Sequence, residues 1–404
     1  MSKVSSNSKS GMMLTLFFMK AFHIIGIFIA SYLAIIMRGF GYSGMQISLF
    51  TSAIGLLYPI TSVIIAFIAD KFGRIKTFRV FKLISLLLIV VMYIFSASKM
   101  IAYALVLTAA IENGLETLIY ALATERCCSE EERSKDFQNV QLGSSIGMVA
   151  FTGVAICFKN PSINTLFLML IGLAVLSFTI SFTLENLPIQ KSSNAQETKG
   201  AKGSLLSLLR KKTLIVCSLI LVLFSIASSQ LNYGFPLTVS DLFGQDTKLL
   251  LNILLCAFYS VMFTANLMLR SILKKYSCIL NMIVAGIIYS VGMTSFFLIE
   301  NIVGFMLGVV LWAIAQYMIN VNNTLLISKS CEKNNIALVS AVFPMVSGSG
   351  TVLGPLLGGI IVNADSVHII WLFNMILVMI GTVLLYILDR FIKKGSNDST
   401  SKTK

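Results

Sequence analysis

Residues 45–97 read MQISLFTSAIGLLYPITSVIIAFIADKFGRIKTFRVFKLISLLLIVVMYIFSA, two long apolar runs joined by one short, charged turn. A helix needs about 20 mostly apolar residues to cross the hydrocarbon core of a bilayer. Strands of a membrane barrel would instead be alternating segments of about 10 residues. The stretch therefore predicts two membrane-spanning helices packed as a hairpin, and similar apolar runs recur through the chain.

The composition supports a membrane protein as a whole. The chain has 404 residues, of which 56% are hydrophobic and 12% charged, whereas a soluble domain carries about 25% charged residues. We interpret the net charge of +14 as a sign of membrane topology and expect no nucleic-acid partner. The sequence has no G-x-x-x-x-G-K-[ST] loop and no metal-ligand spacing, so we expect neither a cofactor nor a metal.

Twelve spans are predicted, and they fall into two sets of six. A polar linker separates the sets. The resulting divisions are a tail (1–11), a first six-helix bundle (12–184), a central linker (185–211), a second bundle (212–388) and a C-terminal tail (389–404). The predicted spans are 12–36, 45–69, 79–97, 101–123, 139–158, 164–184, 212–235, 248–269, 278–298, 303–327, 337–361 and 367–388.

Lys and Arg residues predict the orientation of these spans. If the N-terminus is cytoplasmic, 26 of the 31 basic residues fall in inner segments, including five between Lys71 and Lys82. Only Arg38, Lys99, Lys159 and Lys248 fall outside, and Lys20 lies within the first span. Basic residues accumulate in cytoplasmic loops, so we predict a multi-pass protein of the cell membrane with both termini in the cytoplasm.

The turn after the second span carries a recognisable motif, Ala66-Phe-Ile-Ala-Asp70-Lys71-Phe-Gly73-Arg74-Ile-Lys76. It resembles the G-x-x-x-D-[RK]-x-G-R-[RK] signature of the major facilitator superfamily, with alanine in place of the first glycine and one residue inserted before the final base. The resemblance implies an all-α fold of two six-helix bundles related by pseudo-two-fold symmetry. It also implies that Asp70, Lys71, Gly73 and Arg74 form a conformational latch between the halves. The alternative is a charged turn that only obeys the topology rule.

The eleventh span contains a string of small residues. Glycines spaced by four residues allow helices to approach closely, and a proline can bend a helix. We predict that this string is a packing and bending element, formed by Gly350, Gly354, Pro355, Gly358 and Gly359. Drug exporters of the superfamily carry a similar string in the fifth span, where this chain has none.

Two acidic residues, Glu112 and Glu116, lie deep in the fourth span and share one helix face. Lys20 and His23 are the only basic residues that we place equally deep, in the first span. At 1.5 Å per residue, Lys20 and Glu116 lie about 12 and 10 Å from the cytoplasmic side, and His23 and Glu112 both about 16 Å. The resemblance implies that both spans line one cavity, so we predict the pairs Lys20–Glu116 and His23–Glu112.

Three roles are compatible with this network. It could couple proton movement to transport, hold helices together as a static ion-pair clamp, or bind a cationic substrate through a glutamate.

The second half carries two polar stripes. Their spacing places each stripe on one helix face, and the resemblance implies that these spans line the cavity. We predict that the substrate cavity is lined by Trp312, Gln316, Asn320, Asn323, Ser229, Asn232 and Tyr233. Hydrogen bonding between helices is the alternative role.

The sequence as a whole favours a monomeric secondary transporter that moves a small organic solute by alternating access, coupled to protons. Export of an amphipathic or cationic compound is preferred because fixed acids lie in a weakly charged cavity. Uptake of a sugar or other metabolite is the near alternative. A polytopic membrane enzyme and a receptor without flux are more distant ones, and no catalytic constellation supports an enzyme.

Overall fold

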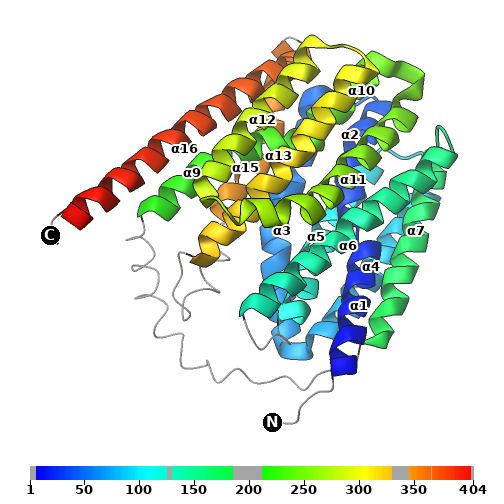
Figure 1. The fold of residues 1–404 in the computed structure, drawn as a ribbon. Helices are drawn as coiled ribbons and strands as arrows, with labels where there is room; N and C mark the ends of the chain where they lie inside the picture. The colour runs from blue at the N-terminus through cyan, green and yellow to red at the C-terminus, as the bar shows by residue number, and fades with distance from the viewer. Residues whose placement is uncertain (1–5, 125–129, 185–211, 330–344, 365, 402–404) are drawn as a thin grey trace.

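The computed structural model describes residues 6–124, 130–184, 212–329, 345–364 and 366–401, and within these ranges every regular element is a helix. The long helices run side by side through the molecule (Figure 1). The first half contains α1 (Ser6–Phe22), α2 (Ile25–Gly39), α3 (Gly44–Phe72), α4 (Arg74–Ile94), α5 (Ile101–Thr124), α6 (Glu130–Cys157) and α7 (Ile163–Ile180). The second contains α9 (Lys212–Ser228), α10 (Gly234–Phe243), α11 (Thr247–Leu273), α12 (Cys278–Leu298), α13 (Ile302–Lys329), α15 (Gly350–Ala364) and α16 (Ile369–Ser401).

These helices make twelve membrane crossings. Eleven segments of the described chain are long and apolar enough to span a bilayer, and one of them, Thr213–Leu273, has 61 residues. A bilayer core is about 30 Å thick and takes about 20 helical residues, so this segment crosses twice, first as α9 and α10 and then as α11. The predicted fold class, two six-helix bundles of an all-α membrane protein, is confirmed. The linker 185–211 and the first part of the predicted eleventh span lie outside the described residues.

The first span differs from the single helix predicted over 12–36. Helix α1 ends at Phe22, α2 begins at Ile25, and His23 and Ile24 lie between them without helical structure. The His23 amide donates to the carbonyl of Lys20 at 3.1 Å, which tightens the last turn of α1. The interruption therefore falls at a residue that the sequence marks as chemically interesting.

The turn between α3 and α4 consists of one residue, Gly73. Its φ of +97° is readily adopted only by glycine, and its amide donates to the carbonyl of Ala69 at 2.8 Å. Helix α4 consequently begins at Arg74, five residues earlier than predicted. The predicted latch residues Asp70, Lys71, Gly73 and Arg74 all lie at this turn.

The two halves meet at one end of the bundle, which we call the distal end because it lies opposite the N-terminus (Figure 1). Hydrogen bonds and ion pairs between the halves gather in this part of the molecule. Arg38 forms an ion pair with Asp241, and Lys248 Nζ donates to the carbonyl of Pro161 at 2.8 Å. The other contacts are Ser31 with Asn232, Arg38 with Leu237, Ser52 with Val352, Tyr233 with Gly44, Leu249 with Asn160 and Cys256 with Val149.

Towards the other, proximal end the halves separate. Contacts between α3 and α15 follow α3 from Gly44 to Gly55, and beyond Pro59 its side chains Val63 and Phe67 are largely exposed. Figure 1 shows the helices of the two halves diverging below the top of the view. The structure is thus closed at its distal end.

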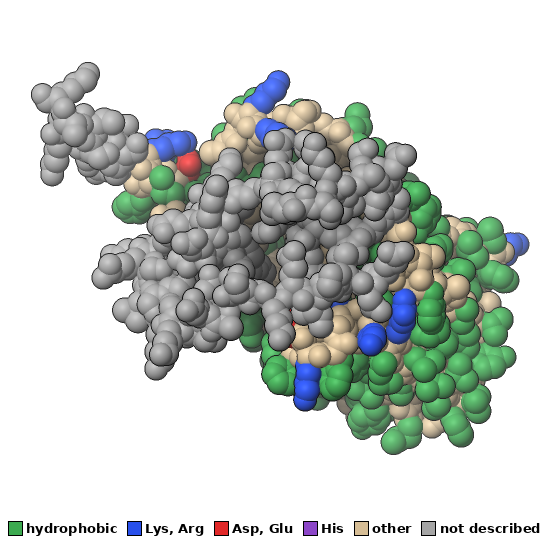
Figure 2. Space-filling view, turned by 90° about the horizontal axis from the view of Figure 1, so that it is seen from below, with side chains coloured by type: hydrophobic (Ala, Val, Ile, Leu, Met, Phe, Trp, Pro, Cys, Tyr) green, Lys and Arg blue, Asp and Glu red, His purple; other side chains and the backbone are tan. Residues whose placement is uncertain are grey.

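Basic side chains mark the proximal end. Figure 2 views the molecule from this end and shows Lys and Arg side chains there, while hydrophobic side chains cover the flank. A surface this apolar is suited to lipid. The basic residues on the proximal turns and helix ends include Lys71, Arg74, Lys76, Lys274, Lys275, Arg390 and Lys393.

Candidate functional site

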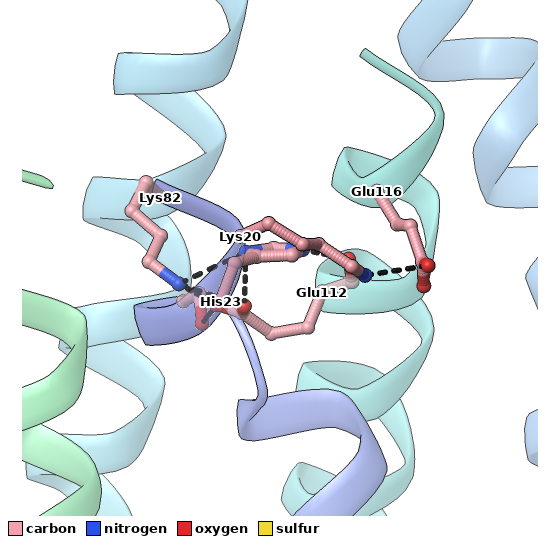
Figure 3. Close-up of polar contacts among 6 residues, drawn as sticks. Lys20, His23, Lys82, Glu112 and Glu116 are labelled. Carbon is pink, nitrogen blue, oxygen red and sulfur yellow. Dashed lines mark hydrogen bonds and ion pairs between the residues drawn. The ribbon is translucent and has the colours of Figure 1, made fainter. Parts of the chain in front are cut away.

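A buried charge network lies inside the first half, where α1, α4 and α5 meet at the break before α2 (Figure 3). At its centre is Glu112, whose side chain is fully buried. Its carboxylate accepts hydrogen bonds from Lys82 Nζ at 2.7 and 3.0 Å and from the hydroxyl of Ser85. His23 Nδ1 lies 3.1 Å from Glu112 Oε2, so the expected proximity of His23 and Glu112 is present.

Lys82 was missed by sequence reasoning, which counted it among the inner basic residues of a loop. The structure corrects this: Lys82 is fully buried in α4 and is the main counter-ion of Glu112. The physical reason is the one-residue turn at Gly73, which starts α4 early and carries Lys82 two helical turns into the membrane. The signal was available, since the predicted third span already included position 82.

The second pair of the network joins α1 to α5. Lys20 Nζ lies 2.5 Å from Glu116 Oε1, as depth along the two helices predicts. Lys20 is buried, whereas the Glu116 side chain is 25% exposed and also receives a hydrogen bond from Tyr120. Glu116 is therefore the acidic member of the network that a solute or water can reach.

Glycines of α6 hold α1 in the position that this pairing requires. A side chain at Gly147 would place its Cβ 2.0 Å from the carbonyl oxygen of Ala21, and one at Gly143 would place it 2.6 Å from that of Phe17. No other residue type allows such an approach. The two glycines thus fix the end of α1 that carries Lys20 and leads into His23.

The bonding of His23 depends on its protonation. Its Nε2 lies 2.8 Å from the backbone carbonyl of Glu112, which can only accept a hydrogen bond, so Nε2 carries a proton. Nδ1 lies 3.3 Å from Lys82 Nζ and 3.1 Å from Glu112 Oε2. A neutral His23 accepts from Lys82 at Nδ1, whereas a cationic His23 donates to Glu112 and faces the ammonium of Lys82.

The network divides the apolar interior of the first half. One hydrophobic cluster, which includes Leu16, Phe78 and Leu115, fills the proximal side. A second cluster, which includes Ile24 and Ala109, continues from the network to the distal end and into the second half. Charges in such surroundings are costly unless paired, and here two lysines face two glutamates.

The predicted cavity residues of the second half occupy two kinds of place. Gln316, Asn320 and Asn323 are half-buried along α13, and Gln316 Nε2 donates to Asn320 Oδ1 at 3.1 Å. Trp312 is fully buried in a cluster of aromatic rings that contains Phe235, Phe258, Tyr289, Phe296 and Trp371.

Ser229, Asn232 and Tyr233 lie between α9 and α10 of the second half. They face α2 and α3 of the first half and α15 of their own half. The Tyr233 hydroxyl donates to the carbonyl of Gly44 at 2.9 Å, and Asn232 accepts from Ser31 at 3.3 Å. Ser229 Oγ lies 1.9 Å from where a Cβ at Gly354 would stand. In this closed arrangement the three side chains belong to the contact between helices.

The small residues of the eleventh span lie at close helix crossings. A Cβ at Gly350 would stand 2.5 Å from the carbonyl of Val222, one at Gly358 2.9 Å from the ring of Tyr233, and one at Gly359 2.2 Å from Ser48 Oγ. Pro355 lies within α15 and is buried. The geometry is that of a packing element between α15, α9 and α3.

Within the described ranges, no group of three or more His, Cys, Asp or Glu side chains is arranged to hold a metal ion. The network of Figure 3 pairs Lys20 with Glu116 and Lys82 with Glu112, so the structure shows ion pairs at this site.

The structure is similar to solved structures of membrane transporters. The structure is similar to a crystal structure of the nucleoside transporter NupG, with a TM-score of 0.73, 14% identity, and coverage of 93% of this chain and 99% of that one. It is also similar to a bacterial homolog of the human lysosomal transporter Spinster in an inward-facing conformation, with a TM-score of 0.75, 14% identity, and coverage of 96% and 98%. A third similar structure is the POT family transporter PepTSo, with a TM-score of 0.71, 10% identity, and coverage of 95% and 98%.

These identities are low, so the likeness shows the fold. A search of curated protein sequences finds no match. The sequence profile of the Major Facilitator Superfamily, however, matches residues 15–353, which include nearly all of the first half, most of the second half and the network. The chain belongs to the Major Facilitator Superfamily and is a multi-pass membrane transporter.

Proposed function

We propose that this transporter couples the movement of a small organic solute to protons, and that His23 together with Glu112 is the coupling site. The observation that carries the proposal is the position of His23 Nδ1, between Lys82 Nζ at 3.3 Å and Glu112 Oε2 at 3.1 Å. A single proton decides which of these two groups His23 can bond. It therefore decides how α1, α2, α4 and α5 are held together.

Charge counting shows why a proton matters here. With neutral His23, Lys20 and Lys82 balance Glu112 and Glu116, and the network has no net charge. Protonation of His23 adds one positive charge in a buried site and sets two cations against Glu112. Relief requires Lys82 to move or Glu112 to be shared, and either change alters the packing of α4 and α5.

The ion pairs of the network also bear on the charge of the solute. The sequence favours export of an amphipathic or cationic compound because fixed acids lie in a weakly charged cavity. In the structure, however, both acids are paired, Glu112 with Lys82 and Glu116 with Lys20. Because Glu112 is fully buried, a substrate cannot reach it in this state. We propose a polar solute without net charge, bound on the second-half side by Gln316, Asn320 and Asn323, which are half-buried.

Alternating access follows from the closed distal end. We propose that the termini and the proximal end face the cytoplasm, and that the structure is an inward-facing state. Opening the distal end requires the ion pair of Arg38 with Asp241 to break. In that state the turn with Asp70, Lys71, Gly73 and Arg74 would approach the second half and act as the latch.

The test uses purified protein in liposomes that contain a pH-sensitive dye. A mixture of neutral polar metabolites, followed by mass spectrometry, identifies a solute whose accumulation depends on the protein and on a pH gradient of either direction. The variants His23→Gln and Glu112→Gln are then compared in two assays. We expect both to lose gradient-driven accumulation while they retain solute counterflow, which requires no net proton movement.

A matched control is Asp389→Asn, which removes an acid that is paired with Lys393 at 2.5 Å on α16 of the second half. We expect it to keep both activities. If His23→Gln and Glu112→Gln both accumulate solute like the wild type, the network is a static clamp and the coupling proposal is wrong. If no neutral solute moves and a cation does, the proposed solute class is wrong.

A further inference from the structure

The strongest unassigned feature is an uncompensated carboxamide at the boundary between the halves. Asn252 of α11 is fully buried. Within the part of the chain that the structure describes, neither its Oδ1 nor its Nδ2 has a hydrogen-bond partner. A buried amide without partners is unfavourable, and natural structures contain few of them.

The neighbours of Asn252 on its own helix show which way it points. Lys248, four residues earlier, donates to the carbonyl of Pro161 in the first half. The thiol of Cys256, four residues later, donates a hydrogen bond to the carbonyl of Val149 in the first half, with Sγ and O 3.9 Å apart. Residues four apart share one helix face, so Asn252 lies between two contacts that cross the boundary.

On the opposite side of the boundary is Tyr32 of α2. Its hydroxyl interacts with the Asn252 side chain, but the contact does not reach hydrogen-bond geometry, and the buried hydroxyl completes no hydrogen bond with a described residue. Its ring stacks on Phe28 at 4.3 Å, and Phe28 in turn meets Phe151 of α6 at 4.5 Å. The polar atoms of Tyr32 and Asn252 thus converge next to flat aromatic surfaces.

We infer that Asn252 and Tyr32 form a solute-binding subsite that opens when the distal end opens. A carboxamide presents one acceptor and two donors in a plane. It is complementary to a solute edge that carries an N–H beside a C=O, as in a primary amide or a cyclic imide. The nearby rings suit a planar solute, because aromatic faces stack favourably. The solute class is therefore a neutral planar amide or imide.

The closed distal end explains why the polar atoms of Asn252 and Tyr32 have no hydrogen-bond partner in this state. Contacts such as Arg38 with Asp241 and Lys248 with Pro161 hold the distal end shut, and Asn252 is fully buried in this state. When the halves part at this end, Tyr32 and Asn252 come to opposite walls of the opening. A bound solute would then supply the hydrogen bonds that both side chains lack.

This inference rests on the proposed transport function for its context, but its test is independent of protons. Purified full-length protein in nanodiscs is titrated at constant pH with uracil and with nicotinamide, and binding is measured as an increase in thermal stability. Mannitol, which offers only hydroxyl groups, and choline, a cation, serve as comparison compounds. We expect uracil or nicotinamide to bind and the comparison compounds not to.

Two variants locate the site. Asn252→Leu is expected to weaken binding roughly 10- to 100-fold, since two hydrogen bonds are lost. Tyr32→Phe, which removes one hydroxyl and keeps the ring, is expected to weaken it about 3- to 10-fold. The matched control is Asn374→Leu. Asn374 is equally buried and its amide also has no partner among described residues, but it lies on α16, which packs on α12 and α9 of the second half.

The outcomes are decisive for this subsite. Binding by mannitol as tight as by uracil or nicotinamide, or no binding by either of these two, overturns the solute class. Equal effects of Asn252→Leu and Asn374→Leu overturn the location, and Tyr32→Phe decides the matter if Asn252→Leu does not fold. Normal binding with no proton coupling in liposomes would reject the proposed coupling and leave the subsite standing.

Discussion

Replacing Lys82 by methionine should destabilise the transporter strongly, because the change leaves the Glu112 carboxylate buried and without its main counter-ion. Lys82 and Glu112 are 0% and 1% exposed and lie 2.7 Å apart. Removing one partner of a buried ion pair costs about 3–5 kcal/mol. Each kcal/mol lowers the melting temperature of a protein of 150–250 residues by about 2–4 °C, and by less in a larger one. We therefore expect a decrease of about 5–10 °C for Lys82→Met.

The assay is thermal unfolding of detergent-solubilised protein, and a double-mutant cycle isolates the pair. Glu112→Gln alone leaves Lys82 charged and unpaired, so it should also lower the melting temperature, while the protein stays folded at the temperature of the transport assay. The double variant removes both charges and should recover at least about 2 kcal/mol of the summed losses. Lys76→Met, an exposed lysine on the same helix, serves as control and should change stability by less than about 0.5 kcal/mol.

Two results would refute this reasoning. One is a Lys82→Met variant that is no less stable than Lys76→Met, which would mean that Lys82 is not buried with Glu112. The other is a double variant whose loss equals the sum of the single losses, which would mean that the two side chains do not stabilise each other.

Three further outcomes are expected. Asp241→Arg should repel Arg38 and shift the halves towards a state open at the distal end. The shift should be about 1 kcal/mol or less, because the Asp241 and Arg38 side chains are 35% and 42% exposed. Distances between spin labels on the two halves measure the shift, and an unchanged distance distribution would reject the prediction. Gly147→Val should separate α1 from α6, because its Cβ would stand 2.0 Å from a backbone carbonyl of α1. The melting temperature should decrease by several degrees. The control Gly153→Val, whose Cβ would meet nothing within 4 Å, should melt like the wild type. Gly354→Val should impair packing of α15, as its Cβ would stand 1.9 Å from a hydroxyl of η3 (Ser229–Leu231), and lose transport together with folded yield; normal yield and transport would contradict the close crossing.

Hydropathy was sufficient to predict the membrane-spanning helices, because a bilayer imposes a length on every crossing. The symmetry that relates the two bundles was implied by the resemblance to the superfamily. The predicted span 278–298 coincides with α12, where Ser277 caps the helix at its start. Prediction was weaker where the chain turns within one residue. Gly73 allows α4 to begin at once, so residues that seem to belong to a loop enter the membrane.

The charge network was predictable in part. Depth along two helices brought Lys20 to Glu116 and His23 to Glu112, because depth is a linear function of residue number. Lys82 was not predicted as part of the network, because the rule that Lys and Arg accumulate in cytoplasmic loops does not consider which of them are paired with acids. Burial of such a lysine is favourable only when an acid meets it, and that acid is 30 residues away in sequence.

The polar stripes of the second half show another limit. The spacing of polar residues predicts which side chains share a helix face, but it does not predict whether that face packs on another helix or lines a cavity. Trp312 and Gln316 belong to one stripe on α13, yet the first is enclosed by aromatic rings and the second is half-buried. Only the neighbouring helices distinguish the two cases.

The interruption at His23 and Ile24 divides the first span into two rods joined by a pivot. The distal rod, α2, has 15 residues and is about 22 Å long, with Arg38 in its last turn. A tilt of about 10° at the pivot displaces the far end by about 4 Å, which is enough to part a contact ion pair. A small rearrangement at His23 would therefore produce a larger displacement at the distal end of α2.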